Sequence, residues 1–273
     1  MDAGVGVGPE RKEGTDWSMS MENPPLEQVR AVLFDLDGTL LGVEMSKFIP
    51  AYLEGLSGHF ADQVDRRAFA RVLTATTFAL LRSDDGSRSN QEMLLEAVGL
   101  HLGIGRAKWE QGLAAFFREG LEDLEKLITS LPLAREILER CFSRNLQVVV
   151  ATNPVFPKPL VDARLQWGNL HDFPFALVTS YENCRYCKPH PGYFQDILQS
   201  VGLQPGQCVM VGNDTEHDLA ARQAGIPTFL VDTWLVDRQQ GSFTTDYRGG
   251  HEDLLEFVGR LGQDPPPISG FGP

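Results

Sequence analysis

The segment 35–39, with the sequence DLDGT, carries the residues with the clearest chemical meaning in this chain. It follows directly on the apolar run 31–34, which is typical of a buried strand. Side chains two positions apart on a strand point the same way, so Asp35 and Asp37 are expected to converge on one site beyond the strand's end. Two close carboxylates repel each other, so either one takes a proton or both share a cation. Gly38 permits the tight turn that leaves the strand.

Two further segments place polar groups where the chain is expected to leave a strand or enter a helix. Thr152 and Asn153 follow the apolar run 148–151, and their hydroxyl and amide can hydrogen-bond a phosphoryl oxygen. A threonine–asparagine pair at such a position also commonly does no more than form a turn. Lys188 lies in a proline-rich loop ahead of a helix that is predicted to begin near residue 191. It can supply a fixed cation beside the paired aspartates, although most lysines are solvated surface residues.

Another strand end, after the apolar run 208–211, brings more carboxylates. Asp214 and Asp218 lie there, and the alternative interpretation is an acidic helix N-terminus favoured by the helix dipole. Mg²⁺ prefers oxygen ligands and is commonly held by one or two carboxylates together with phosphate and water. Asp35, Asp214 and a backbone carbonyl near Asp37 can supply such a shell. The metal would then offset the repulsion between the carboxylates.

Short apolar runs that alternate with helical patterns indicate the elements that position these groups. Runs that are apolar on both faces, with helices between them, are typical of a buried parallel sheet. The sequence therefore predicts an α/β fold with a doubly wound, Rossmann-like parallel sheet, whose site lies at the carboxyl ends of the strands. The runs are 31–34, 148–151, 175–178, 208–211 and 228–231, and the helices predicted between the later runs cover about 158–167, 191–200 and 215–224.

The block 44–130 has a different pattern, because it contains no strand-like run and its apolar residues follow helical spacing. Ser89 followed by Glu92 predicts a capping box at the start of a helix. We interpret the aromatic and aliphatic residues of the block as the core of a helical insertion rather than as a cofactor site. Arg82 or Arg88 could contact a second anionic group of a substrate, although arginines beside a turn are more often solvated.

Composition limits the classes of partner and location. The 273 residues carry a formal net charge of -13 and a pI near 4.9, so nucleic acid is not expected as a partner. No apolar run approaches the ~18 residues needed to span a membrane, and the N-terminus lacks the apolar core of a signal peptide. The four cysteines suggest no disulfide framework, so a cytoplasmic location is expected. Cys184 and Cys187 form one C-x-x-C pair without a second, and we interpret them as incidental.

Taken in order, these segments resemble the four motifs of the haloacid dehalogenase superfamily of hydrolases, and together they span about residues 31–231. The helical insertion resembles the helical cap of that superfamily. The matching residues are Asp35, Asp37, Gly38 and Thr39 in the first motif, Thr152 in the second, Lys188 in the third, and Gly212, Asn213, Asp214 and Asp218 in the fourth. The organisation predicted on this basis is a disordered N-terminal extension (1–28), an α/β catalytic core (29–43 and 131–261), a helical cap (44–130) and a loose C-terminal tail (262–273).

The resemblance implies a role for each of the catalytic residues. Asp35 is expected to be the nucleophile that takes the phosphoryl group as an aspartyl-phosphate, and Asp37 is expected to be the general acid and base. Thr152 and Lys188 are expected to bind phosphoryl oxygens, with Asn153 beside them. Lys188 is also expected to offset the charge on Asp35.

The resemblance also implies a Mg²⁺ site that includes Asp35 and Asp37. Asp214 is expected to be the main ligand from the fourth motif, and Asp218 a supporting or water-mediated one. Many members of the superfamily carry an aspartate where this chain has Asn213. Either Asp214 takes the ligand role, or Asn213 binds the metal through its neutral carbonyl.

These roles predict a Mg²⁺-dependent phosphatase, a phosphoric monoester hydrolase, that acts on a small phosphorylated metabolite. Dehalogenases attack carbon and need no second acid at this position, so the presence of Asp37 favours phosphoryl transfer. The alternatives are a sugar-phosphate mutase of the same superfamily and a non-catalytic metabolite-binding protein on this fold. The sequence predicts neither the particular phosphoester nor the oligomeric state.

Overall fold

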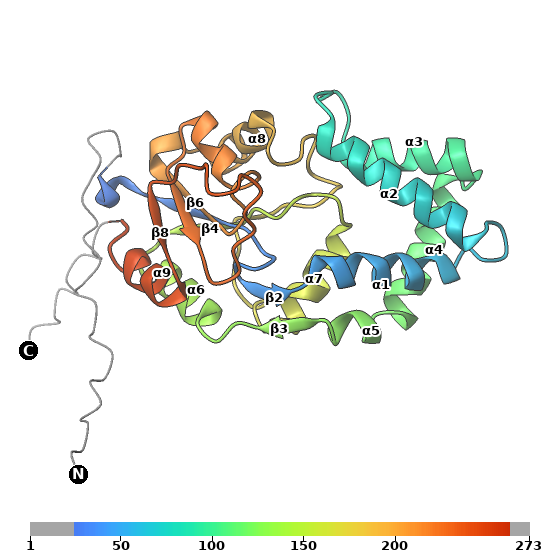
Figure 1. The fold of residues 1–273 in the computed structure, drawn as a ribbon, viewed down its shortest axis with the longest axis horizontal. Coiled ribbons are helices and arrows are strands. Elements are labelled where there is room, and N and C mark those ends of the chain that lie inside the picture. The colour runs from blue at the N-terminus through green and yellow to red at the C-terminus, as the bar shows by residue number, and fades with distance from the viewer. Residues whose placement is uncertain (1–24, 263–273) are drawn as a thin grey trace, which may run out of the picture.

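The computed structural model describes residues 25–262. Its centre is a six-stranded parallel sheet with the strand order β5-β4-β1-β6-β7-β8 (Figure 1). The chain enters at the middle strand and later extends the sheet on both sides, which confirms the predicted doubly wound α/β fold. The strands are β1 (Ala31–Phe34), β4 (Gln147–Val150), β5 (Leu177–Val178), β6 (Cys208–Gly212), β7 (Thr228–Val231) and β8 (Tyr247–Gly249).

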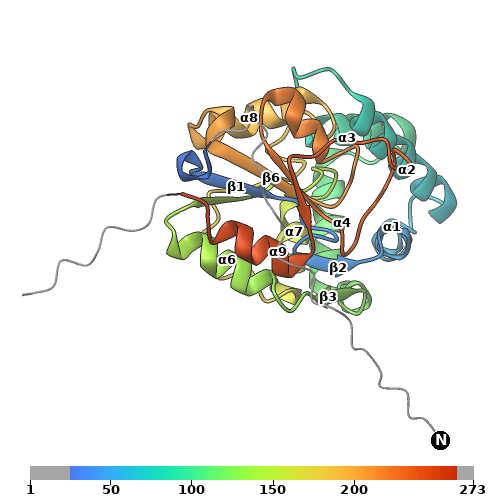
Figure 2. The same cartoon turned by 60° about the vertical axis from the view of Figure 1, so that its left-hand side comes forward.

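Helices cover both faces of this sheet (Figure 2). Val32 and Phe34 of β1 belong to one buried apolar cluster, which includes side chains of α6, α7 and α9. Ala31 and Leu33 belong to the other, which includes side chains of α8 and the 3₁₀ helix η3. Burial on both faces explains why the strand is apolar at every position. The elements are α6 (Ala134–Ser143), α7 (Lys158–Trp167), α8 (Pro191–Val201), η2 (Pro205–Gln207), η3 (Leu219–Ala224) and α9 (His251–Val258).

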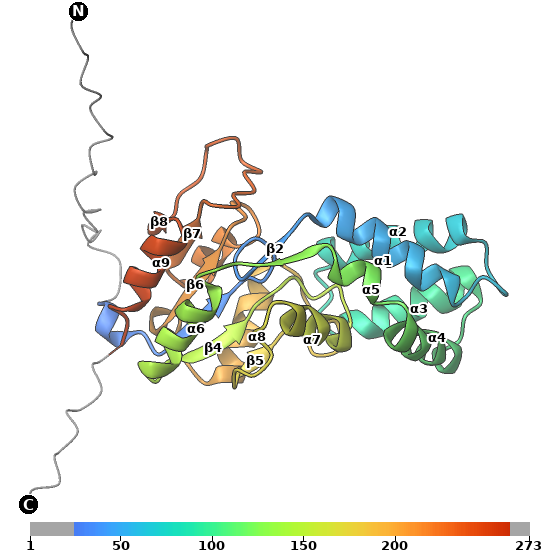
Figure 3. The ribbon, with the colours of Figure 1, turned by 90° about the horizontal axis from the view of Figure 1, so that it is seen from below.

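The helices between β1 and β4, here called the helical block, lie to one side of the sheet (Figures 1 and 3). A two-stranded antiparallel ribbon of β2 (Leu41–Val43) and β3 (Ile128–Ser130) carries the chain into and out of the block. The predicted capping box of Ser89 and Glu92 is present at the start of α3. The block consists of α1 (Met45–Gly58), α2 (Arg66–Arg82), α3 (Asn90–Leu102), α4 (Arg106–Glu119) and α5 (Glu122–Glu125).

The structure differs from the sequence-based expectations at short elements. β3 lies inside the range 44–130, where no strand is expected, because pairing with β2 rather than an apolar run defines its three residues. The segment predicted as a helix over 215–224 forms the 3₁₀ helix η3 in its second half only. β8 is also missed, because Arg248 and Gly249 leave Tyr247 as the one apolar side chain of this three-residue strand.

The predicted loose ends fall largely outside the described residues. The range 1–28 reaches the described chain only at its last four residues, where Leu26–Gln28 form the 3₁₀ turn η1. Of the range 262–273, Gly262 alone is described, and its backbone N–H donates to the carbonyl of Leu26 at 2.9 Å. Within residues 25–262, no helix combines the length and apolar character that crossing a bilayer requires.

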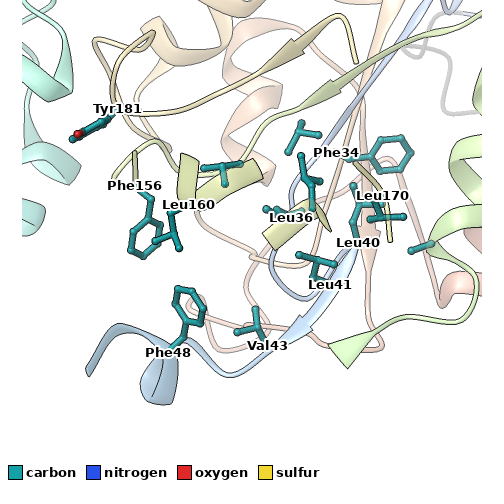
Figure 4. Packing of buried hydrophobic residues seen from close by; sticks show 14 of the residues in the cluster. Phe34, Leu36, Leu40, Leu41, Val43, Phe48, Phe156, Leu160, Leu170 and Tyr181 are labelled. Carbon is teal, nitrogen blue, oxygen red and sulfur yellow. The ribbon is translucent and has the colours of Figure 1, made fainter. Parts of the chain in front are cut away.

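Apolar contacts, some of whose side chains are shown in Figure 4, and backbone hydrogen bonds join the helical block to the sheet core. Phe48 and Tyr52 of α1 meet the ring of Phe156 edge-on, with ring centroids 6.0 and 5.4 Å apart. The start of α3 also contacts the core, because the N–H of Asn90 donates to the carbonyl of Cys184 at 2.9 Å. These contacts hold α1 and α3 against the loops that leave the carboxyl ends of the strands.

Candidate active site

All eight residues proposed from the sequence as catalytic, phosphoryl-binding or metal-binding line one cavity of about 450 Å³. They reach it from the carboxyl ends of neighbouring parallel strands. Phe34 at the end of β1 pairs with Val150 of β4 and Val211 of β6, so the loops that follow all three strands begin at one edge. The eight are Asp35, Asp37, Thr152, Asn153, Lys188, Asn213, Asp214 and Asp218.

The centre of this site is a buried lysine between two carboxylates. Lys188 is 2% exposed, and its Nζ lies 2.6 Å from Oδ1 of Asp35 and 2.7 Å from Oδ1 of Asp218. Burial alone would lower the pKa of Lys188, but the charges of Asp218 and Asp35 outweigh it and raise that pKa. Burial raises the pKa of Asp218 to about 6, against the attraction of Lys188. The lysine therefore stays a cation and offsets the charge of Asp35.

The loop that follows β4 is hydrogen-bonded to the segment that carries Lys188. Thr152 lies two residues beyond the end of β4, and its main-chain carbonyl accepts hydrogen bonds from the hydroxyls of Thr179, at 2.8 Å, and Tyr193, at 2.9 Å. The side-chain carbonyl of Asn153 accepts from the backbone N–H of Lys188 at 3.1 Å. Asn153 thus ties the Lys188 loop to the β4 loop, in addition to lining the cavity.

The two candidate metal ligands after β6 have different surroundings. Oδ1 of Asp214 accepts from the backbone N–H groups of Glu216 and His217, both at 3.0 Å, and Oδ2 accepts from Nε of Arg238 at 2.6 Å. Burial would raise the pKa of Asp214, but the hydrogen bonds and charges of His217 and Arg238 lower it well below its ordinary value. Asn213 donates to the carbonyl of Trp234 at 2.6 Å, and its Oδ1 accepts a long hydrogen bond from the hydroxyl of Thr39 at 3.4 Å.

Sequence reasoning missed Arg164 of α7, which forms an ion pair with Asp37 and is fully buried. Its guanidinium lies over the rings of Phe48 and Phe156, at 5.2 and 5.5 Å from their centroids. Burial lowers the pKa of Arg164 to about 10, so it remains charged at neutral pH. Its Nε and Nη1 have no hydrogen-bond partner among the described atoms. The sequence did contain an indication that Arg164 is buried, because helical spacing places it on the same face of α7 as the apolar Leu160.

Other candidates from the sequence lie away from the cavity. Arg88 is exposed and pairs with Glu96 and Asp85, and neither Arg88 nor Arg82 lines the cavity. In this structure neither arginine is placed to meet a second anionic group in the cavity. Cys184 and Cys187 are buried and unpaired, and burial raises the pKa of each thiol to about 12.

The donor set is compatible with a magnesium ion. Within the described part of the chain, no group of three or more His, Cys, Asp or Glu side chains is arranged to hold a metal alone. Mg²⁺ does not require such a cage, because it keeps several waters and combines one or two carboxylates with substrate phosphate. Asp35, Asn213 and Asp214 all present oxygens to the same cavity.

Comparison with known proteins identifies the class. The family model for haloacid dehalogenase-like hydrolases matches residues 29–225, which is most of the chain. The chain therefore belongs to this family of hydrolases. It is 24% identical over 240 residues to "Pyrophosphatase PpaX" of Oceanobacillus iheyensis, covering 86% of this chain and 97% of that protein. It is also 24% identical over 217 residues to the protein of the same name from Bacillus cereus strain AH820, covering 77% and 87%.

Solved structures show the same fold. A HAD phosphatase from Thermococcus onnurineus aligns with a TM-score of 0.54 at 20% identity, covering 85% of this chain and 99% of that one. An L-2-haloacid dehalogenase from Xanthobacter autotrophicus, with chloropropionic acid covalently bound, aligns with a TM-score of 0.51 at 17% identity, covering 84% and 98%. Because both a phosphatase and a dehalogenase match equally well, the fold does not separate the two chemistries.

The buried cluster makes a prediction about stability. Lys188→Met should lower the free energy of unfolding by about 3–5 kcal/mol, because it leaves Asp35 and Asp218 as buried carboxylates without a cation. Adding Asp218→Asn to that variant should recover part of the loss, since it removes one of the two like charges. Urea denaturation in the presence of a chelator measures both effects. Strictly additive losses from the two substitutions would show that the charges do not interact.

Proposed function

We propose that this hydrolase is a Mg²⁺-dependent phosphatase that acts on a small phosphorylated metabolite through an aspartyl-phosphate intermediate. The observation that carries the proposal is the convergence of Asp35, Asp37 and Lys188 in one cavity, with Lys188 Nζ 2.6 Å from Asp35. Membership of the hydrolase family supports it, as do the pyrophosphatase and phosphatase names of similar proteins. Asp37 further supports phosphoryl transfer, because attack on carbon needs no second acid there.

The proposed reaction has two steps. In the first, Asp37 has taken a proton and left its ion pair with Arg164 before the reaction begins. Asp35 then attacks phosphorus, the bond from phosphorus to the leaving oxygen breaks, and Asp37 donates its proton to that oxygen. In the second, Asp37 takes a proton from a water molecule that attacks the phosphorus of the aspartyl-phosphate, which releases inorganic phosphate and regenerates Asp35. Lys188, Thr152 and Asn153 would bind the phosphoryl oxygens.

Asp35, the main-chain carbonyl of Asp37 and the side-chain carbonyl of Asn213 would hold the magnesium ion, with Asp218 acting through water. When bound, the cation neutralises charge on the phosphoryl group. We favour Asn213 over Asp214 as the direct ligand. Oδ2 of Asp214 lies 2.6 Å from the cation of Arg238 and its Oδ1 accepts two backbone hydrogen bonds, whereas Oδ1 of Asn213 accepts one long hydrogen bond of 3.4 Å. Asp214 would then lie just outside the coordination shell of the magnesium ion and contribute its negative charge there.

We further propose that the helical block is a cap that controls solvent access to the site. Side chains of α1 and α2 line the cavity together with the strand-end residues, so moving the block would open it. The corresponding division of the chain is a cap at 44–130 and an α/β core at 29–43 and 131–261. A cytoplasmic location is also proposed, and four unpaired cysteines support it.

A phosphoester screen tests the proposed activity. The wild-type protein should release inorganic phosphate from p-nitrophenyl phosphate and from members of a metabolite panel, and a chelator should abolish the release. Asp35→Asn should be inactive yet folded, because Asp and Asn have nearly the same size and Lys188 keeps its ion pair with Asp218. An isomerised sugar phosphate without free phosphate would indicate a mutase, and tight binding without turnover would indicate a binding protein. Either result would contradict the proposed phosphatase activity.

The proposed role of Asp37 predicts a kinetic signature. With p-nitrophenyl phosphate, whose leaving group needs no proton, Asp37→Asn should form the intermediate and then hydrolyse it about 10²–10⁴-fold more slowly than wild type. Stopped-flow absorbance should therefore show a burst of p-nitrophenolate that is stoichiometric with enzyme. Benzyl phosphate has a basic leaving group that needs a proton, so this variant should show no burst of benzyl alcohol from it. Wild-type turnover rates in this variant would rule out Asp37 as the acid and base.

A further inference from the structure

The cavity has a charged floor and an uncharged wall. The floor consists of the eight strand-end residues described above, and the wall is formed by side chains from α1, α2 and the loop after β4. No wall residue carries a charge, and the hydroxyls of Ser46 and Thr77 are its polar groups. The wall residues are Met45, Ser46, Ile49, Thr77, Leu81, Val155 and Phe156.

Each lysine or arginine among the described residues that line the cavity already faces a carboxylate. Lys188 contacts Asp35 and Asp218, and Nε of Arg238 lies 2.6 Å from Asp214. Glu44, at the start of α1, adds a negative charge to the lining, and its carboxylate is held at the surface by Lys47 at 2.8 Å. His217 also lines the cavity, and its Nδ1 lies 3.3 Å from Oδ2 of Asp214. A second anionic group placed against the wall would thus meet apolar side chains and Glu44 rather than an unpaired cation.

Exposed apolar side chains gather at this cavity. Residues 25–262 leave five large hydrophobic side chains exposed, and three of them line it: Ile49 at 38%, Trp234 at 37% and Val236 at 38% exposure. Ile49 lies on the helical block, while Trp234 and Val236 lie on the loop after β7, so the three reach the cavity from both sides. Exposed apolar surface gathered at one place on a protein commonly marks a binding site.

We propose that the substrate is a phosphate monoester whose alcohol portion is uncharged and presents an apolar face to the wall. This inference rests on the proposed phosphatase function and names the class of ester that the site prefers. With the phosphoryl group on Lys188 and Thr152, the alcohol portion lies between Ile49 on one side and Trp234 on the other. A cavity of about 450 Å³ admits a small molecule of this kind. Ser46 and Thr77 can hydrogen-bond one or two hydroxyls or carbonyls on it.

Matched esters test the charge preference directly. Benzyl phosphate and 4-carboxybenzyl phosphate have similar leaving groups and differ by one remote carboxylate. With Mg²⁺ present, kcat/KM should be about tenfold or more higher for benzyl phosphate, because the added carboxylate would lose water without gaining a partner. Phosphoglycolate and inorganic pyrophosphate, which also carry a second anionic group, should be poor substrates. Equal or greater kcat/KM for 4-carboxybenzyl phosphate would overturn the inference.

A matched pair of variants locates the preference in the wall. Ile49→Arg places a cation at the cavity and should reverse the selectivity, raising kcat/KM for 4-carboxybenzyl phosphate and lowering it for benzyl phosphate. Leu100→Arg is the control, because Leu100 is a 75% exposed hydrophobic residue of the same helical block that does not line the cavity. It should leave both values unchanged. If Ile49→Arg does not fold, Val236→Arg on the opposite side serves in its place.

The outcomes separate this inference from the function on which it rests. Hydrolysis of p-nitrophenyl phosphate with a preference for the carboxylated ester, or for phosphoglycolate, overturns the inference and leaves the phosphatase standing. Failure to hydrolyse any phosphoester by folded, Mg²⁺-supplied protein overturns both. Selectivity for benzyl phosphate that is unchanged in Ile49→Arg and in Val236→Arg shows that the wall does not set it, and also overturns the inference.

Discussion

The arrangement of the site depends on one buried cation, Lys188, between the carboxylates of Asp35 and Asp218. The parallel sheet brings acidic residues from β1 and β6 to the same edge, where their repulsion would otherwise oppose folding. Lys188 is 2% exposed and contacts both carboxylates, so its positive charge offsets part of their repulsion. The same arrangement leaves Asp35 beside a cation and facing the cavity, which is where a phosphoryl group would need a nucleophile and a positive charge.

A second buried cation, Arg164, connects this chemistry to the helical block. It pairs with Asp37 while its guanidinium lies over the rings of Phe48, from α1, and Phe156, from the loop after β4. The position of Asp37 is therefore linked to the packing of α1 against the core. Since α1 also contributes Ile49 to the cavity, the same helix contacts both the Arg164–Asp37 pair and the cavity wall.

Much of the sheet and the site could be predicted from the sequence because each depends on local patterns. The apolar runs give the central strands, and the polar residues that follow within three positions give Asp35, Thr152 and Asp214. Arg164 could not be assigned a role, because only the three-dimensional fold brings α7 against the loop after β1. The β2–β3 ribbon and Arg238 were missed for a related reason: each depends on pairing with a distant segment rather than on its own sequence.

The most direct test of the central claim is to detect the phosphorylated enzyme. Wild-type protein would be mixed with p-nitrophenyl phosphate and Mg²⁺, quenched with acid within the first turnover, digested and analysed by mass spectrometry. The account predicts a phosphoryl adduct on the peptide that contains Asp35, and no adduct in Asp35→Asn. Hydrolysis that proceeds without any adduct at early times, or with an adduct on another residue, would contradict it.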